Sequence, residues 1–141
     1  MDNSEQSTRT TTVVISSKER DLHIYPTPLK YRLALPTILR RVVGVELLGV
    51  VYDESQESPL LLRIHEFDNE ICSNVEKVRS ALMLVGTPDV GRLDAPVTLK
   101  STINTLDRLT VGWDSLGDHE LVSMPEHMLV LRVSCLVDTL T

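Results

Sequence analysis

Residues 40–52, RRVVGVELLGVVY, are the most strongly strand-like stretch of this chain. Valine and leucine dominate it, and branched apolar side chains pack well on a pleated sheet. Gly44 and Gly49 interrupt the run, and glycines inside a long strand often mark a bend or a bulge. The stretch therefore predicts a long strand that is bent or bulged at its glycines.

The segments on either side of this strand also alternate between apolar and polar residues. Residues 59–67, PLLLRIHEF, follow the polar turn DESQES, so residues 40–67 are typical of a hairpin. Residues 29–35, LKYRLAL, place Leu and Tyr on one face and Lys, Arg and Ala on the other, as in a half-buried strand. Pro36 is expected to end that strand, because proline has no N–H to donate to a neighbouring strand.

Further strands are expected at residues 12–16, 105–113 and 127–137, and turn-forming residues separate all of these segments. The count is seven or eight short strands, with at most one short helix. This pattern predicts an all-β protein, and specifically a single antiparallel β-sandwich of the jelly-roll-like type.

Residues 71–85 fit two structures. Apolar residues recur there at helical spacing, and Ser73 followed by Glu76 matches a capping box. The compact apolar run ALMLV instead resembles a buried strand. We predict a turn or short helix near 73–78 and a strand near 79–85.

The length of the chain, 141 residues, is close to the commonest size of one domain. Residues 1–11 are rich in Ser, Thr, Asn and Gln and have no apolar residue after Met1, which is typical of a flexible polar tail. We therefore expect a tail at residues 1–11 and one β-sandwich domain at residues 12–141.

The net charge and the apolar pattern exclude several classes of function. A formal charge of −6 argues against sequence-independent binding of nucleic acid and against electrostatic binding to an anionic membrane. The longest apolar run is broken by Glu46 and is about half the length needed to span a bilayer. The N-terminal residues lack the apolar core of a signal peptide, so we expect a cytosol-like compartment.

The sequence offers few residues for catalysis. Residues 114–120, DSLGDHE, contain Ser, His and carboxylates, but these are neighbours in one loop and no G-x-S-x-G turn is present. The glycines of GTPDVG, residues 86–91, lack the Lys-Ser/Thr of a phosphate-binding loop. We expect no enzymatic activity and no cofactor, and we expect Trp113 to be a core or rim residue.

Metal ligation is also not expected. His65 and Glu66 would point to opposite faces of a strand, and a surface or rim role is expected for the pair Glu126 and His127. Cys72 and Cys135 lie far apart without C-x-x-C spacing, which argues against a structural zinc site.

The stretch SSKERDLHIYPTPLKYRLAL, residues 16–35, is the most unusual segment. It could be a catalytic loop, a structural staple or a plain solvated loop. Pro26 and Pro28 fix φ and are expected to hold the chain extended where it enters the next strand. Tyr25 can lay its ring on the edge of the core, while Arg20 and Asp21 can pair with each other or with backbone groups. We favour the structural staple.

The order of these motifs resembles a known family. Ser-Ser-Lys-Glu-Arg-Asp at 16–21 and Tyr-Pro-Thr-Pro at 25–28 precede ILRRVVGVELLGVVY at 38–52. The segments PLLLRIHEF, ALMLV, TLDRLTVGWDSLGD and EHMLVLRVSCL follow later. This order is similar to the small β-sandwich minor capsid proteins of large icosahedral double-stranded DNA viruses of eukaryotes. It covers residues 15–137. Those chains usually have Asn where Arg41 stands here, and a proline turn where this chain has DESQES.

The resemblance implies a structural protein that cements or links major capsomers in a viral shell, without catalysis. It implies the major capsid protein and other minor capsid proteins as partners, with copies of itself as a further candidate. It also implies a place in the virion, with assembly in the host cytoplasm. A non-viral β-sandwich adaptor that binds a protein by edge-strand pairing is the alternative. The structural or interface candidates are Arg20, Asp21, Tyr25, Pro26, Pro28, Glu46, Trp113 and His127.

Overall fold

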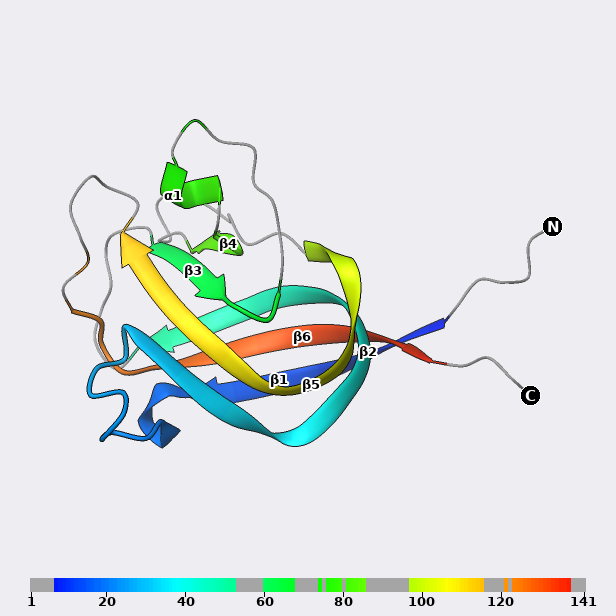
Figure 1. Ribbon diagram of the computed structural model, residues 1–141, viewed down its shortest axis with the longest axis horizontal. Helices are drawn as coiled ribbons and strands as arrows, with labels where there is room; N and C mark the ends of the chain where they lie inside the picture. Colours follow the sequence, from blue (N-terminus) through cyan, green and yellow to red (C-terminus); the bar gives the residue numbers. More distant parts are fainter. Residues whose placement is uncertain are drawn as a thin grey trace.

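The computed structural model describes residues 7–52, 60–67, 74, 76–79, 81–85, 97–115, 121 and 123–137. Most of these residues lie in strands and very few in helices, so the all-β prediction is confirmed. In chain order the elements are β1 (Ser7–Ser16), the 3₁₀ turn η1 (Ser17–Glu19), β2 (Lys30–Tyr52), β3 (Leu60–Ile64), α1 (Glu76–Arg79), β4 (Met83–Val85), β5 (Val97–Ser115) and β6 (His127–Val137) (Figure 1).

The strands form one antiparallel sheet in the order β1-β6-β2-β5-β3-β4. Figure 1 shows β2 and β5 strongly curved. The first part of β2 pairs with β5, from Lys30 opposite Gly112. Its second part pairs with β6, ending with Tyr52 opposite His127. The curvature therefore brings side chains from both parts of β2 into one core.

β2 merges two strands that the sequence predicts separately, at 29–35 and 40–52. The prediction that Pro36 ends a strand is wrong, because β2 continues through it. The missing N–H of Pro36 instead interrupts pairing, since the ladder with β5 breaks between Ala34 and Leu39. This merger is one reason why the described residues contain six strands rather than the seven or eight predicted.

The predicted irregularities at Gly44 and Gly49 are confirmed. The register of β2 shifts between Val42 and Gly44 and again between Leu47 and Gly49. A side chain at Gly44 would lie 3.2 Å from the carbonyl oxygen of Val97, so the close approach of β5 requires a small residue there.

Two boundaries differ from the sequence predictions. Residues 7–11 of the predicted tail belong to β1, where Ser7 lies opposite Val137, because the backbone of these polar residues pairs with β6. Residues 1–6 lie outside the described residues. Within the ambiguous segment 71–85, the described residues include one short helix, α1, and one short strand, β4.

The buried side chains of the sheet form one core cluster. On β2 the predicted alternation of LKYRLAL is confirmed, with Tyr31 fully buried and Lys30 and Arg32 exposed. Fully buried side chains from β2, β3, β5 and β6 include Tyr31, Leu47, Leu60, Leu62, Ile64, Leu106, Leu109, Val111, Leu129 and Leu131. Among the described residues, no helix is both long enough and apolar enough to cross a membrane.

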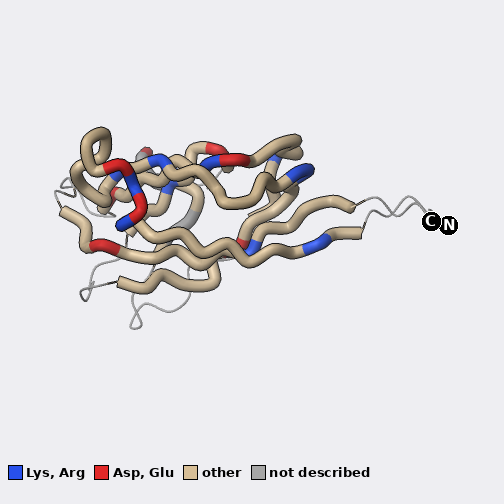
Figure 2. The backbone as a smooth tube through the Cα atoms, turned by 90° about the horizontal axis from the view of Figure 1, so that it is seen from below, with Lys and Arg blue, Asp and Glu red and all other residues tan. Residues whose placement is uncertain are grey.

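The charged side chains show no single-sign surface. Figure 2 shows acidic and basic positions interspersed over the described part of the chain.

Candidate functional site

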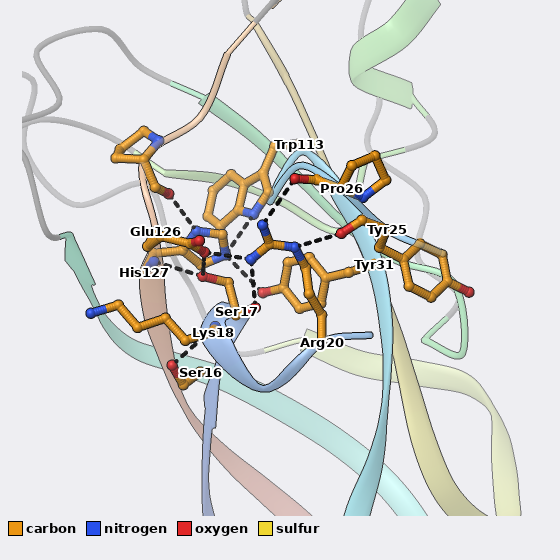
Figure 3. A network of polar contacts seen from close by, with 11 residues as sticks. Ser16, Ser17, Lys18, Arg20, Tyr25, Pro26, Tyr31, Trp113, Glu126 and His127 are labelled. Carbon is orange, nitrogen blue, oxygen red and sulfur yellow. Dashed lines mark hydrogen bonds and ion pairs between the residues drawn. The ribbon is translucent and has the colours of Figure 1, made fainter. Parts of the chain in front are cut away.

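The stretch that was singled out in the sequence forms a polar network around Arg20, which is 6% exposed. The Arg20 guanidinium donates from Nε to the carbonyl oxygen of Tyr25 at 2.8 Å and from Nη2 to that of Pro26 at 3.2 Å. Its Nη1 donates to the carbonyl oxygen of Ser17 at 2.7 Å and to the Glu126 carboxylate at 2.5 Å. Figure 3 shows these partners arranged around the guanidinium. We call Ser17, Arg20, Tyr31, Trp113, Glu126 and His127 the staple network.

The local chain conformation places Arg20 at this position. The hydroxyl of Ser16 accepts a hydrogen bond from the backbone N–H of Lys18 at 3.3 Å and caps the η1 turn. The N–H of Arg20 then donates to the carbonyl oxygen of Ser17 and closes that turn. Arg20 is thereby turned inward, beneath the loop that leads to β2.

Glu126 provides the charge that balances the buried guanidinium. Its partial burial raises the pKa of the carboxyl, but hydrogen bonds from Ser17 and Arg20 and the positive charge of Arg20 outweigh that effect. The pKa of Glu126 is therefore lowered from its ordinary value, and the carboxylate stays ionised. A buried charge that is paired and fully hydrogen-bonded in this way does not carry the large cost of an isolated one.

Ser17 joins this ion pair to the start of β6. Its hydroxyl donates to the Glu126 carboxylate at 2.7 Å and accepts the backbone N–H of His127 at 2.9 Å. Ser17 directly follows β1 and Glu126 directly precedes β6. The hydrogen bond therefore connects two strand ends that lie more than a hundred positions apart in the sequence.

His127, which is 2% exposed, carries the network into the core. Its Nε2 lies 3.1 Å from Nε1 of Trp113 and 2.7 Å from the Tyr31 hydroxyl, while its Nδ1 lies 3.0 Å from the carbonyl oxygen of Pro125. An indole N–H can only donate, so Nε2 accepts and Nδ1 carries the hydrogen. The imidazole is therefore neutral and fixed in one tautomer.

The aromatic rings around His127 come from different strands. The Trp113 ring of β5 meets the imidazole edge-on, with centroids 5.1 Å apart and an interplanar angle of 79°. The Tyr31 ring of β2 lies 5.5 Å away at 47°. Burial raises the pKa of the Tyr31 phenol, against the smaller opposing effect of Arg20, so this hydroxyl stays protonated as a donor.

The polar groups of the staple network are paired with one another. The Ser17 hydroxyl is already engaged by the Glu126 carboxylate and by a backbone N–H. In the described part of the chain, every buried side-chain nitrogen and oxygen has a hydrogen-bond partner. No group of three His, Cys, Asp or Glu side chains that could hold a metal occurs among these residues. The arrangement is that of a structural staple.

The loop above the staple network is internally ordered. The Asp21 carboxylate accepts the backbone N–H of His23 at 2.9 Å, and the Asp21 carbonyl oxygen accepts that of Tyr25 at 2.7 Å. Arg20 thus binds backbone groups and Glu126 rather than Asp21. Leu22 and Ile24, which are 60% and 65% exposed, project from this loop. We call residues 21–26 the stapled loop.

The remaining predicted residues fall in different places. Tyr25 packs on the edge of the core, as predicted. Pro28 lies in a turn, so the prediction that it holds the chain extended where the chain enters the strand is wrong. The strand itself, β2, begins only at Lys30. Glu46 lies opposite Arg132 and pairs with it at 3.4 Å on the outer face, away from the staple network.

Trp113 and His127 meet in the core. A core position is one of the two alternatives predicted for Trp113, whereas the surface or rim role expected for His127 is wrong. The alternation of HMLVLRVSCLV directs His127 to the same face as Leu129 and Leu131, and this pattern could have indicated its burial.

Sequence reasoning missed Ser17, Tyr31 and Glu126 as members of one site. Ser17 and Glu126 share no motif, and their proximity arises only because β1 pairs with β6 along its whole length. Of the loop 114–120, Asp114 and the buried Ser115 end β5, and residues 116–120 lie outside the described residues.

A second feature is an open cleft of about 900 Å³ over β2, β3 and β5. Arg63 and Asp114 pair there at 3.4 Å, and Thr110 binds the Glu66 carboxylate through both its N–H and its hydroxyl. These contacts tie the polar groups of the cleft to one another. Further lining residues are Leu29, Lys30, Arg32, His65, Phe67 and Leu121.

Comparison with known proteins adds no relative. No protein-family profile matches the chain, and no curated protein matches it. Its function is therefore argued from its own residues.

Proposed function

We propose that this chain is a structural minor capsid protein that cements or links major capsomers in the shell of a large icosahedral DNA virus, and that it is not an enzyme. The observation that carries the proposal is the stapled loop. One buried guanidinium binds the carbonyl oxygens of Tyr25 and Pro26 and is itself anchored by Ser17 and Glu126, and the loop that it holds presents two large apolar side chains to solvent.

A rigid apolar loop is well suited to binding protein. Association costs the ordering of flexible segments, and a loop already held in its bound shape avoids that cost. Energetically dominant contacts in protein interfaces are few and clustered. Leu22 and Ile24 lie two residues apart on the stapled loop and can enter one apolar depression of a neighbouring subunit. The major capsid protein and other minor capsid proteins are the proposed partners.

The resemblance to capsid proteins rests on the residues that build the staple. The Ser-Lys-Glu-Arg-Asp segment contributes Ser17 and Arg20, and Tyr25 and Pro26 provide two carbonyl acceptors. Arg41 stands where the resembling chains have Asn, and its φ is 57°. Asn tolerates that left-handed conformation better than most residues, so the position has the backbone geometry that suits the family's residue.

We further propose that the curved sheet closes into a jelly-roll-like β-sandwich. In support, β2 and β5 are shared between two parts of the sheet, and their buried side chains belong to one core cluster with β3 and β6. The proposed place of action is the virion, with assembly in the host cytoplasm.

Purified particles provide the test. We expect quantitative mass spectrometry to find the chain in a fixed ratio to the major capsid protein, as lattice positions require. The double variant Leu22→Ser/Ile24→Ser should lose incorporation while keeping its thermal midpoint, because both side chains face solvent. Ile38→Ser is the matched control: this residue of β2 is 50% exposed outside the stapled loop, and the variant should be incorporated normally.

Two results would contradict the proposal. One is absence of the chain from purified particles. The other is normal incorporation of the double variant.

A non-viral adaptor that binds a partner by edge-strand pairing is the second candidate. The free edge of β1, which has β6 as its only strand neighbour in the described part of the chain, favours it. Absence from particles, together with recovery of one stoichiometric partner that protects the β1 backbone from hydrogen exchange, would favour this second function.

A further inference from the structure

β1 is an open edge of the sheet. Among the described residues it pairs only with β6, in one continuous register from Ser7 opposite Val137 to Ser16 opposite Met128. The backbone groups of a strand point alternately to its two sides, so about half of the N–H and C=O groups of β1 face away from β6. The opposite edge, β4, has only three residues, and its shortness limits pairing there.

β1 also lacks the usual protection of an edge strand. Natural edges are blocked by proline, bulges or inward-pointing charges. The ten residues STRTTTVVIS contain no proline, no glycine and one charge, Arg9, and pair with β6 without a register shift. The six residues from Thr10 to Ile15 are all β-branched, the class that is enriched in strands. This edge is therefore suited to accept another strand.

We propose that β1 pairs antiparallel with β1 of a second copy, across a two-fold axis that passes at Thr12. In this register Thr12 faces Thr12 of the other copy, and Val14 faces its Thr10. A two-fold axis perpendicular to the sheet keeps outward residues opposite outward residues, so the buried faces of both copies stay on one side. Nine residues of each strand, 8–16, then lie opposite each other.

The distribution of charge favours a second copy over an unrelated strand. With the axis at Thr12, the two Arg9 residues lie six positions apart along the pair, or roughly 20 Å at the rise of a strand. That separation exceeds the Debye length of about 8 Å at physiological ionic strength, so the two arginines do not repel each other appreciably. The centre of the pair contains only uncharged β-branched residues, which form favourable cross-strand contacts.

Arg132 lies opposite Thr12 on the outer face, and toward Val14 the outer face beside this edge becomes apolar. Val14 lies next to Val130 in the register, and Met128 lies next to Val51, with Val14, Met128 and Val51 all exposed. The patch therefore reaches the edge at Val14. Pairing would place Thr10 of the second copy beside Val14 and cover part of this surface.

Self-pairing goes beyond the proposed function, since a capsid subunit can bind capsomers as a monomer. The test is sedimentation velocity of the full chain over a wide range of concentration. We expect wild-type protein to form a dimer that dissociates on dilution. Thr12→Lys and Thr12→Asp should each weaken dimerisation by roughly tenfold, because each places like charges directly opposite at the axis. An equimolar mixture of the two variants should recover the dimer.

Thr102→Lys is the control, because Thr102 is an exposed threonine of β5 and the variant should dimerise like wild type. Thermal unfolding checks that all variants are folded. A wild-type chain that stays monomeric at every concentration, a dimer insensitive to both Thr12 variants, or a mixture that fails to recover would overturn the proposal. None of these results bears on incorporation into particles, so the capsid proposal is judged separately.

Discussion

Trp113 donates its indole hydrogen to Nε2 of His127 at 3.1 Å, and this contact fixes the state of the buried imidazole. Because the indole cannot accept, the ring must present a lone pair there, and the Tyr31 hydroxyl reaches the same atom at 2.7 Å. Two donors from two strands thus depend on one acceptor at the first residue of β6. The strength of this dependence can be measured.

Replacing His127 by Phe should destabilise the protein strongly. The variant keeps an aromatic ring but leaves the Trp113 N–H and the Tyr31 hydroxyl buried without an acceptor, at about 1–3 kcal/mol each. We expect a loss of roughly 2–5 kcal/mol in the free energy of unfolding, measured in urea. Tyr31→Phe removes only one donor and leaves Nε2 paired with Trp113, so its cost should be about 1 kcal/mol. Equal costs for the two variants would show that His127 is not the shared acceptor.

Arg20 and Asp21 should contribute very differently to stability, although both belong to the charged cluster that precedes Tyr25 and Pro26 in the sequence. Arg20→Ala removes four hydrogen bonds and leaves Glu126 without its cation, which predicts a loss of roughly 2–4 kcal/mol. Asp21→Ala loses one bond from its carboxylate within an exposed turn, which predicts about 1 kcal/mol or less. Chemical denaturation of both variants measures this difference. Arg20→Lys keeps the positive charge but lacks the planar set of donors of the guanidinium, so its loss of stability should fall between those of the two alanine variants.

The Arg20 variant should also loosen the stapled loop. Hydrogen exchange of the Tyr25 N–H, which donates to Asp21, reports on the loop directly. We expect faster exchange there in Arg20→Ala and little change at the centre of β6. Unchanged exchange at Tyr25 would mean that Arg20 does not order the loop.

Glu126 should give the protein a measurable sensitivity to acid. Its pKa is lowered in the folded state, so the unfolded chain binds a proton more readily as the pH falls. The stabilisation is therefore complete above the unfolded pKa, near 4.5, and is lost as the pH falls through the lower folded value. Denaturant unfolding across this range measures the slope of stability against pH. Glu126→Gln should flatten it, and a slope equal to that of the wild type would contradict this role of Glu126.

The sequence predicts the strands well because alternation is a local signal. Tyr31 is buried and Lys30 and Arg32 are exposed, as a period of two requires. The continuity of β2 through Pro36 could not be predicted from local residues, since it depends on the pairing with β5 that resumes at Leu39. The irregular ladder also carries both Leu106 and Leu109 into the core, although strict alternation assigns them to opposite faces.

The candidate site was predictable only in part. The cluster around Arg20 stands out in the sequence as an unusual motif of charged residues followed by two prolines. Its partner Glu126 is more than a hundred positions away, and nothing in the sequence marks it. Long-range pairs of this kind arise from strand order, which a single sequence does not specify.

Arg41 is the one described residue other than glycine with a positive φ, 57°, and it directly precedes Val42, where β2 begins to pair with β6 while its pairing with β5 continues. A residue with a side chain loses about 1–2 kcal/mol of stability when its backbone adopts this left-handed conformation, whereas glycine adopts it freely. Arg41 also makes a polar interaction, so its direct replacement changes two things at once. The informative comparison is Arg41→Gly against Arg41→Ala, because both variants lose that interaction and only alanine retains the strain.

We expect Arg41→Gly to be more stable than Arg41→Ala by about 1 kcal/mol, the reverse of the order found inside ordinary strands, where glycine is the weaker residue. Arg41→Asn should lie between them, because Asn tolerates the left-handed region better than Ala. Urea unfolding of the three variants provides the measurement, with Gly49→Ala as a control at a glycine whose added methyl group would meet open space. If alanine proves as stable as glycine at position 41, the bend of β2 does not depend on the left-handed conformation, and the register shift beside Gly44 must be sufficient to turn the strand.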